Sequence, residues 1–134
     1  QLPIVRFNVQ SHLGEQVETA LRRLGISPAR RLEVETADTL TSMVAGGIGW
    51  AVTTPLCLLQ GARSAGAVRQ DFVPELNAQR KLYLHVRKGE YDELGKQAFE
   101  LAGSILDGYV RSELKALNPS LPNLVQLHPW SPAT

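Results

Sequence analysis

The feature that most constrains the fold is an order repeated three times along the chain. A short segment with a strand pattern is followed by small hydroxyl or carboxylate residues and then by apolar residues at helical spacing. The strand patterns are an apolar-rich run at 3–9, alternating polar and apolar residues at 31–35, and a continuous apolar run at 48–52. Strands that alternate with helices are typical of an α/β sheet, because each helix carries the chain back to the start of the next strand. This alternation therefore predicts an α/β fold with a mixed, mostly parallel sheet flanked by helices.

Caps and glycines mark where the three expected helices begin and end. Serine, threonine and aspartate oxygens accept hydrogen bonds from the free N–H groups of a first helical turn, and proline is favoured at the first helical position. Glycine is the usual residue just after a helix. The expected helices start at Ser11, at Thr36 or Asp38, and at Pro55, and they end at Gly25, Gly46-Gly47 and Gly61.

The second half of the chain is predicted to add strands and a long helix. Residues 68–73 are a candidate strand, and residues 81–87 alternate polar and apolar side chains as a half-buried strand does. Residues 91–117 carry an apolar stripe at helical spacing. Prolines recur after residue 117, which predicts an irregular tail. The expected divisions are 1–88 for the α/β region, 89–117 for the helix and 118–134 for the tail.

Composition excludes several classes of protein. With 134 residues, of which 43% are hydrophobic and 20% charged, the chain suits one soluble domain with a real core. A net charge of +1 gives no argument for a nucleic-acid surface. No apolar run approaches the roughly 20 residues of a membrane span, and the start does not resemble a signal peptide. We therefore expect a cytoplasmic protein without a membrane partner. The lack of an initiator Met suggests a fragment or a processed chain.

No set of residues assembles a reaction or a metal site. The three histidines lie far apart, and none has a cysteine or carboxylate at metal-ligand spacing. Cys57 lies among leucines, which favours a small buried hydrophobic residue over a nucleophile. Ser11 and His12 are not a catalytic pair, because neighbours at a helix start point in different directions. We expect no enzyme, no catalytic residue, no metal and no cofactor.

The three strand-to-helix junctions favour ligand binding instead. In an open α/β sheet such junctions gather at the carboxyl ends of the strands, where ligands bind. A helix start offers free N–H groups and the positive end of the dipole, which suit a carboxylate or phosphate. Gly14 would let a ligand approach the backbone, and His12 adds a side-chain donor. The alternative is that all three junctions are ordinary caps. The candidate effector-binding residues are Asn8, Ser11, His12, Thr36, Asp38, Thr53 and Thr54.

Three segments together resemble the LysR-type transcriptional regulators. Residues 35–61, ETADTLTSMVAGGIGWAVTTPLCLLQG, resemble that family's signature: a strand, a short helix ending in Val-Ala-x-Gly-x-Gly, a buried strand and a proline. Residues 3–28 resemble the segment in which the family's chain crosses into its second regulatory subdomain. Residues 80–90, RKLYLHVRKGE, and the helix from Tyr91 resemble its last strand and C-terminal helix. The resemblance covers roughly residues 3–115.

This resemblance implies a periplasmic-binding-protein-like (type 2) effector-binding domain, in which two α/β subdomains flank a cleft for a small molecule, often an organic anion. The chain resembles the second subdomain, 1–88, and a helix, 89–117, that in the family returns to the first subdomain. The implied function is ligand sensing by a bacterial transcription factor. The implied partners are a small effector, further copies of the chain, and DNA only through an N-terminal helix-turn-helix that is absent here.

Two other functions stay open on the same scaffold. A small-molecule enzyme or an exported solute-binding domain can share this fold, because fold does not fix function. The helices could also serve oligomerisation alone, in which case a ligand titration should find no small anion bound. We further expect self-association, because the helix from Tyr91 lacks its family partner here and exposed apolar stripes favour interfaces.

Overall fold

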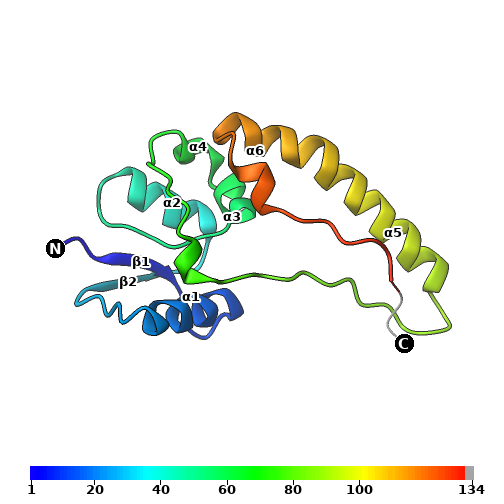
Figure 1. The fold of residues 1–134 in the computed structure, drawn as a ribbon, viewed down its shortest axis with the longest axis horizontal. Helices are drawn as coiled ribbons and strands as arrows, with labels where there is room; N and C mark the ends of the chain where they lie inside the picture. Colours follow the sequence, from blue (N-terminus) through cyan, green and yellow to red (C-terminus); the bar gives the residue numbers. More distant parts are fainter. Residues whose placement is uncertain (132–134) are drawn as a thin grey trace. The chain divides into compact units, whose positions relative to one another are not determined.

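The computed structural model describes residues 1–131, and the chain divides into two compact units. The first unit is Gln1–Arg80 and the second begins at Lys81. Figure 1 shows the elements of both units. Each unit is described by itself below.

The first unit is built around a parallel sheet of two strands, β1 (Ile4–Phe7) and β2 (Arg31–Val34). Helix α1 (His12–Arg23) joins them, since parallel strands need a crossover connection. A further segment runs along β1, where the Val5 N–H donates to the Trp50 carbonyl at 2.8 Å. Ile4 and Trp50 form a parallel bridge on that side. β1 is therefore the central strand of the unit, with partners on two sides.

One face of β1 is covered by α1. Ile4 is buried against Val17 and Leu21, which lie four residues apart on the helix. Ser11 is the N-cap of this helix, as its position predicts. The apolar stripe that predicted α1 is thus the surface that packs on the sheet.

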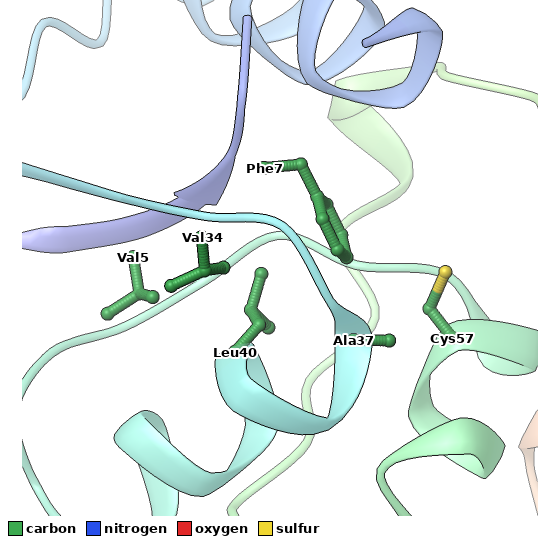
Figure 2. Close-up of a cluster of buried hydrophobic side chains, with 6 residues drawn as sticks. All are labelled: Val5, Phe7, Val34, Ala37, Leu40 and Cys57. Atoms are coloured by element: carbon green, nitrogen blue, oxygen red, sulfur yellow. The ribbon is translucent and has the colours of Figure 1, made fainter.

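The other face of β1 is covered by α2 (Ala37–Ala45) and α3 (Pro55–Gln60). Val5 and Phe7 alternate with the residues that face α1, because successive side chains of a strand point to opposite faces. Figure 2 shows the resulting cluster between the strands and the two helices. The buried members of this cluster are Val5, Phe7, Val34, Ala37, Leu40 and Cys57. The unit therefore has helices on both faces of a small parallel sheet.

Glycines end the first two helices through the same hydrogen-bond pattern. After α1, the Gly25 N–H donates to the Arg22 carbonyl at 3.0 Å and the Ile26 N–H donates to the Leu21 carbonyl at 2.9 Å. Gly25 has φ +68°, which a residue with a side chain rarely adopts. Gly47, with φ +74°, ends α2 in the same way. The predicted stops at both places are confirmed.

The segment predicted as a buried strand at 48–52 is reduced to one bridge. Only Trp50 pairs in the manner of a strand, with Ile4. Beside it, a Cβ on Gly49 would collide with the Pro3 carbonyl oxygen. Among the described residues, backbone bonds between this segment and the first strand are made by Trp50 alone, to Pro3 and Val5. The prediction of a full strand is therefore wrong.

The predicted strand at 68–73 is also wrong. In the described chain this segment is irregular and lies between a short helix, α4 (Ala62–Ala65), and a 3₁₀ turn, η1 (Pro74–Leu76). Phe72 and Val73 are exposed. A segment without a neighbouring strand to pair with does not form a strand.

The second unit contains the long helix predicted at 91–117, with one interruption. It begins as α5 (Asp92–Ile105), continues as a π-helical turn, η2 (Leu106–Val110), and ends as α6 (Arg111–Leu117). The extent of the helix is close to the prediction. The π turn is a local change of hydrogen bonding that apolar spacing does not reveal.

The tail was predicted to be irregular, and this is wrong for one turn. Leu121–Leu124 form a 3₁₀ turn, η3. Asn118 sets it up, because its carbonyl accepts from the Leu121 N–H and its side-chain oxygen accepts from the Ser120 N–H, both at 3.0 Å. The rest of the predicted tail up to Ser131 has no regular structure, and 132–134 lie outside the described residues.

Residues 81–87, predicted as a half-buried strand, are extended but pair with no other strand among the described residues. Leu82, Leu84 and Val86 are exposed, although they alternate as predicted. Val86 packs against α5, since a Cβ on Gly95 would lie 2.7 Å from its Cγ1. The strand prediction is wrong because alternation sets the side-chain faces, whereas a strand needs a backbone partner.

Candidate functional site

The starts of α2 and α3 lie together around the end of β1. Phe7, the last residue of β1, packs in one cluster with Ala37 and Cys57. Ala37 is the first residue of α2, and Cys57 lies in the first turn of α3. Figure 2 shows Phe7 directed toward both. The junctions that precede α2 and α3 therefore lie close to the end of β1. Asn8, the next residue after Phe7, begins the junction that precedes α1.

The junctions after β1 and β2 are joined directly. The Asn8 N–H donates to the Val34 carbonyl at 3.2 Å, and the Asn8 Nδ2 donates to Glu35 Oε1 at 3.2 Å. This places Asn8 next to the residue that precedes Thr36. All three junctions share the carboxyl edge of the sheet, which we call the strand-end edge and define by residues 8–12, 35–38 and 53–54.

Three predicted site residues act as helix caps. Each accepts a hydrogen bond from a first-turn N–H through its side-chain oxygen, which removes one free donor from each helix start. The bonds run to Ser11 Oγ from the Gly14 N–H at 3.1 Å, to Thr36 Oγ1 from the Thr39 N–H at 3.2 Å, and to Thr54 Oγ1 from the Cys57 N–H at 3.3 Å. Ser11 Oγ also donates to the Asn8 carbonyl at 2.6 Å. These hydroxyls are thus already engaged within the chain.

Other donors at the edge have no partner within residues 1–131. The first two N–H groups of α1 belong to His12 and Leu13, and those of α2 belong to Ala37 and Asp38. At a helix start the residue four positions earlier lies outside the helix, so its carbonyl does not point at these N–H groups. They are the donors that an anion at this edge would meet.

Thr53 differs from the three caps. Its hydroxyl is buried and has no hydrogen-bond partner among the described residues. A buried hydroxyl without a partner costs free energy, because it has lost its bonds to water without replacing them. Thr53 is therefore the predicted site residue whose polar group is available for a bond that the described chain does not supply.

The charges at the strand-end edge are mixed. His12, Glu35 and Asp38 are exposed, and Asp38 lies in the first turn of α2. A carboxylate in a first turn stabilises the helix dipole, and it also repels a second anion. The start of α2 is therefore less suited to an anion than the start of α1.

The prediction that Gly14 opens the backbone to a ligand is wrong. A Cβ at this position would collide with the Asn8 carbonyl oxygen and would lie 2.9 Å from that of Phe7. The space left by the missing side chain is filled by the chain's own turn after β1. Gly14 thus allows the close packing of α1 on this turn.

Comparison with known proteins gives the family. Residues 1–100 match the family described as the LysR substrate binding domain. The chain belongs to this family. The match includes every predicted site residue, the whole first unit and the start of α5. Neither a search of curated proteins nor a search of solved structures found a match.

Membership of the LysR substrate-binding family gives the coarse features of the domain. The family implies a periplasmic-binding-protein-like type 2 fold, and the helix-rich α/β arrangement with a small parallel sheet is compatible with it. The family serves ligand sensing in transcriptional regulators and is not a family of enzymes. The resemblance to LysR-type regulators inferred from sequence is confirmed.

One buried charge in this LysR domain was missed by sequence reasoning. Arg6, on β1, is 10% exposed in its side chain and bonds Glu18 of α1 at 2.6 Å and Glu33 of β2 at 2.9 Å. Arg31 approaches Glu18 at 3.8 Å. The ion pairs tie α1 to both strands, so they support the position of the helix that begins at Ser11. An arginine at an inward position of an apolar strand is the signal that could have identified it.

Within residues 1–131 of the LysR domain, no three histidine, cysteine or carboxylate side chains lie close enough together to hold a metal ion. Cys57 is buried in the cluster around Phe7. No helix in the same part of the chain has the length and apolar character needed to cross a membrane.

Proposed function

We propose that this LysR domain is the ligand-sensing part of a bacterial transcription regulator and that a small organic anion binds at its strand-end edge. The intact protein would be a cytoplasmic homo-oligomer that binds DNA through a helix-turn-helix outside this chain. Effector binding would shift the population between two arrangements of the oligomer and so change DNA binding. Residues 1–88 would form the second regulatory subdomain of a mostly parallel sheet, with 89–117 returning to the first and 118–134 as a tail.

The observation that carries the proposal is the buried hydroxyl of Thr53, which has no partner in residues 1–131. It lies at the same edge as the four free N–H groups of α1 and α2. The hydroxyl is covered in this structure. A conformation in which an effector oxygen reaches it would gain a hydrogen bond that the free domain lacks. Such a differential contact is what a ligand needs in order to shift a conformational equilibrium.

The charges at the edge suggest how an effector is oriented. Its carboxylate or other anionic group would lie toward the start of α1, where His12 and the free N–H groups are the donors. Thr53 and Thr54 would approach from the end of the segment beside β1, and Asn8 and Thr36 would lie between the two. Asp38 would accept a hydrogen bond from a hydroxyl or amino group elsewhere on the effector.

The first subdomain of the family would supply the other wall of the cleft. A ligand held by one wall stays largely in water and meets only part of its hydrogen-bonding partners. We therefore expect weak binding to the isolated chain. The decisive tests belong in the intact regulator, with a transcriptional reporter and a panel of small carboxylates, aromatic acids and amino acids.

The sharpest variant is Thr53→Val, which keeps the shape of the side chain and removes the unpaired hydroxyl. Stability should rise by about 1 kcal/mol, because the uncompensated desolvation of the buried hydroxyl is removed and no bond within residues 1–131 is lost. The effector concentration for half-maximal response should rise about tenfold, the equivalent of one hydrogen bond to a charged group. Thermal unfolding and a reporter titration measure the two effects.

Thr41→Val is the matched control. Thr41 lies one turn further along α2, where its Oγ1 is buried and donates to the Ala37 carbonyl at 2.9 Å; the substitution leaves the first-turn N–H groups of α2 in place. Its loss should cost about 1 kcal/mol of stability and leave the effector titration unchanged. An unchanged titration in Thr53→Val, or an equal shift in both variants, would contradict the proposed site. Ser11→Ala is a less specific test, since it also removes the cap of α1.

A further inference from the structure

The long helix of the second unit has a weak point near its middle. The π turn η2 lies there, and the Arg111 N–H that follows it is shared between the carbonyls of Leu106 and Gly108. Gly103 lies just before the turn and Gly108 lies within it, and a Cβ on either would meet nothing within 4 Å. Helices bend at π turns and near glycines, because the regular hydrogen-bond ladder is interrupted and glycine adds backbone freedom. We call residues 103–110 the hinge.

The tail turns back along this helix and contacts it on both sides of the hinge. Figure 1 shows the chain after α6 running back toward the start of α5. Beyond the hinge, η3 packs against α6, and Leu114 of α6 and Leu121 of η3 are both buried. Before the hinge, Phe99 of α5 meets Trp130 edge to face, with ring centroids 5.4 Å apart. We call residues 118–131 the strap, because they span the hinge.

One arginine joins the strap to the hinge. Arg111 Nε donates to Asp107 Oδ1, in η2, at 2.7 Å. Its Nη1 donates to the Pro122 carbonyl, in η3, at 2.7 Å. A guanidinium is planar and rigid, so it holds two acceptors in fixed directions. Arg111 therefore fixes one end of the strap relative to the π turn.

The other end of the strap is held by little. Among the described residues, 126–131 make no backbone hydrogen bond, and Leu127 and His128 are exposed. The aromatic contact of Trp130 is what places this end on α5. Segments with few buried contacts and few hydrogen bonds open at a much lower free energy than the whole fold. This end of the strap can therefore leave α5 while the rest of the second unit stays folded.

We infer that the hinge and the strap form a conformational switch. With Trp130 on Phe99, the strap holds α5 and α6 in one arrangement, and its release lets α6 move about the π turn. The strap and the hinge both lie outside residues 1–100, which match the family, so the switch belongs to this chain's own C-terminal part. The inference goes beyond the proposed function, and its failure would leave the effector site unaffected.

Hydrogen exchange of the 134-residue chain tests whether the strap restrains the hinge. Trp130→Ala removes the aromatic contact and leaves the bond from Arg111 to η3 in place. Amide exchange of residues 103–111 should become roughly tenfold faster or more, because the hinge is then held from one side only. Leu127→Ala is the matched control, since Leu127 lies in the same segment and is 38% exposed. It should leave the exchange unchanged.

Spin-label distances test whether α6 moves. Glu100→Cys on α5 and Lys115→Cys on α6 are exposed positions on either side of the hinge, and the helical rise places their backbones about 22 Å apart. Cys57 is buried and is retained. The distribution of distances between the two labels should be narrow in the parent chain. It should broaden when Trp130→Ala is added.

Stiffening the hinge tests the same switch from the other side. Gly103→Ala with Gly108→Ala removes the freedom of both glycines without a clash. Added to Trp130→Ala, this pair should return the exchange and the label distances toward those of the parent. Gly66→Ala is the control, since Gly66 lies in the first unit and a Cβ there also meets nothing within 4 Å. It should restore neither.

Faster exchange confined to the hinge in Trp130→Ala, with broader label distances and recovery by the two hinge alanines, supports the inference. Unchanged exchange or unchanged distances in Trp130→Ala would overturn it. Equal acceleration by Leu127→Ala, or equal recovery by Gly66→Ala, would overturn it as well. Faster exchange throughout the second unit would also overturn it, because the strap would then hold the fold of the unit rather than the hinge.

Discussion

The two units use apolar residues of the same types in opposite ways. In the first, Val5, Phe7 and Leu40 are enclosed between a sheet and two helices. In the second, Leu94 and Leu101 lie along a helix with one face open. Both sets have the spacing that predicts a buried surface. The difference shows that spacing tells which side of an element is apolar, whereas burial depends on a second element placed against it.

Backbone pairing shows the same contrast. Residues 31–34 and 81–87 both alternate polar and apolar side chains. The first segment follows α1, which carries the chain back to β1. It therefore lies beside β1 and forms a strand. The second segment finds no other strand among residues 81–131 of its own unit and is unpaired there. A β pattern therefore becomes a strand only where the chain supplies a neighbour.

The largest expected effect comes from matched leucine deletions in the two units. Leu40→Ala should lower the free energy of unfolding by about 2–5 kcal/mol, because Leu40 is 2% exposed and its loss leaves a cavity. Leu101→Ala should change it by less than about 0.5 kcal/mol when copies are kept apart by dilution. Urea unfolding of each variant measures the difference. Similar losses in both would show that the second unit also buries its stripe within one chain.

Two helical glycines, one in each unit, should respond to alanine with stability changes of opposite sign. Gly14→Ala should destabilise by about 1–3 kcal/mol, because the new Cβ collides with the Asn8 carbonyl, which cannot move freely. Gly103→Ala, in α5, meets nothing within 4 Å and should stabilise by about 0.5–1 kcal/mol through helix propensity. Thermal melts of the two variants give the signs. A neutral Gly14→Ala would contradict the close packing of α1 on its preceding turn.

The smallest effect concerns ion pairs. Glu18→Gln removes a charged partner from the buried Arg6 and should cost about 1–2 kcal/mol. Glu90→Gln breaks an exposed pair with Arg87 and should cost less than about 0.5 kcal/mol. The stability of the parent chain in 1 M salt provides a check, since only the exposed pair is strongly screened. Equal costs would mean that burial of Arg6 adds nothing.

Sequence predicted what local chemistry decides. The caps at Ser11, Thr36 and Thr54 and the stops at Gly25 and Gly47 appear as expected, because each depends on atoms within a few residues. The shared edge of the junctions followed from parallel strand order.

Sequence could not predict features that depend on distant neighbours. The number of strands was overestimated, since the partners for 68–73 and 81–87 are absent from the described residues. Arg6 was missed because its two carboxylates come from a helix and a second strand. Gly14 was predicted to make room for a ligand, whereas the space beside it is filled by the backbone of the turn that precedes α1.

The central place of β1 also sets the order in which the chain can fold. Ile4 must meet both Arg31 and Trp50, and such non-local contacts form slowly because a long loop has to close first. Helix formation in α5 uses only neighbouring residues and takes about a microsecond. The stripe on α5 is therefore present while the strand edges of the first unit are still open. Refolding yield should depend on protein concentration during that interval, before the native contacts of β1 are complete.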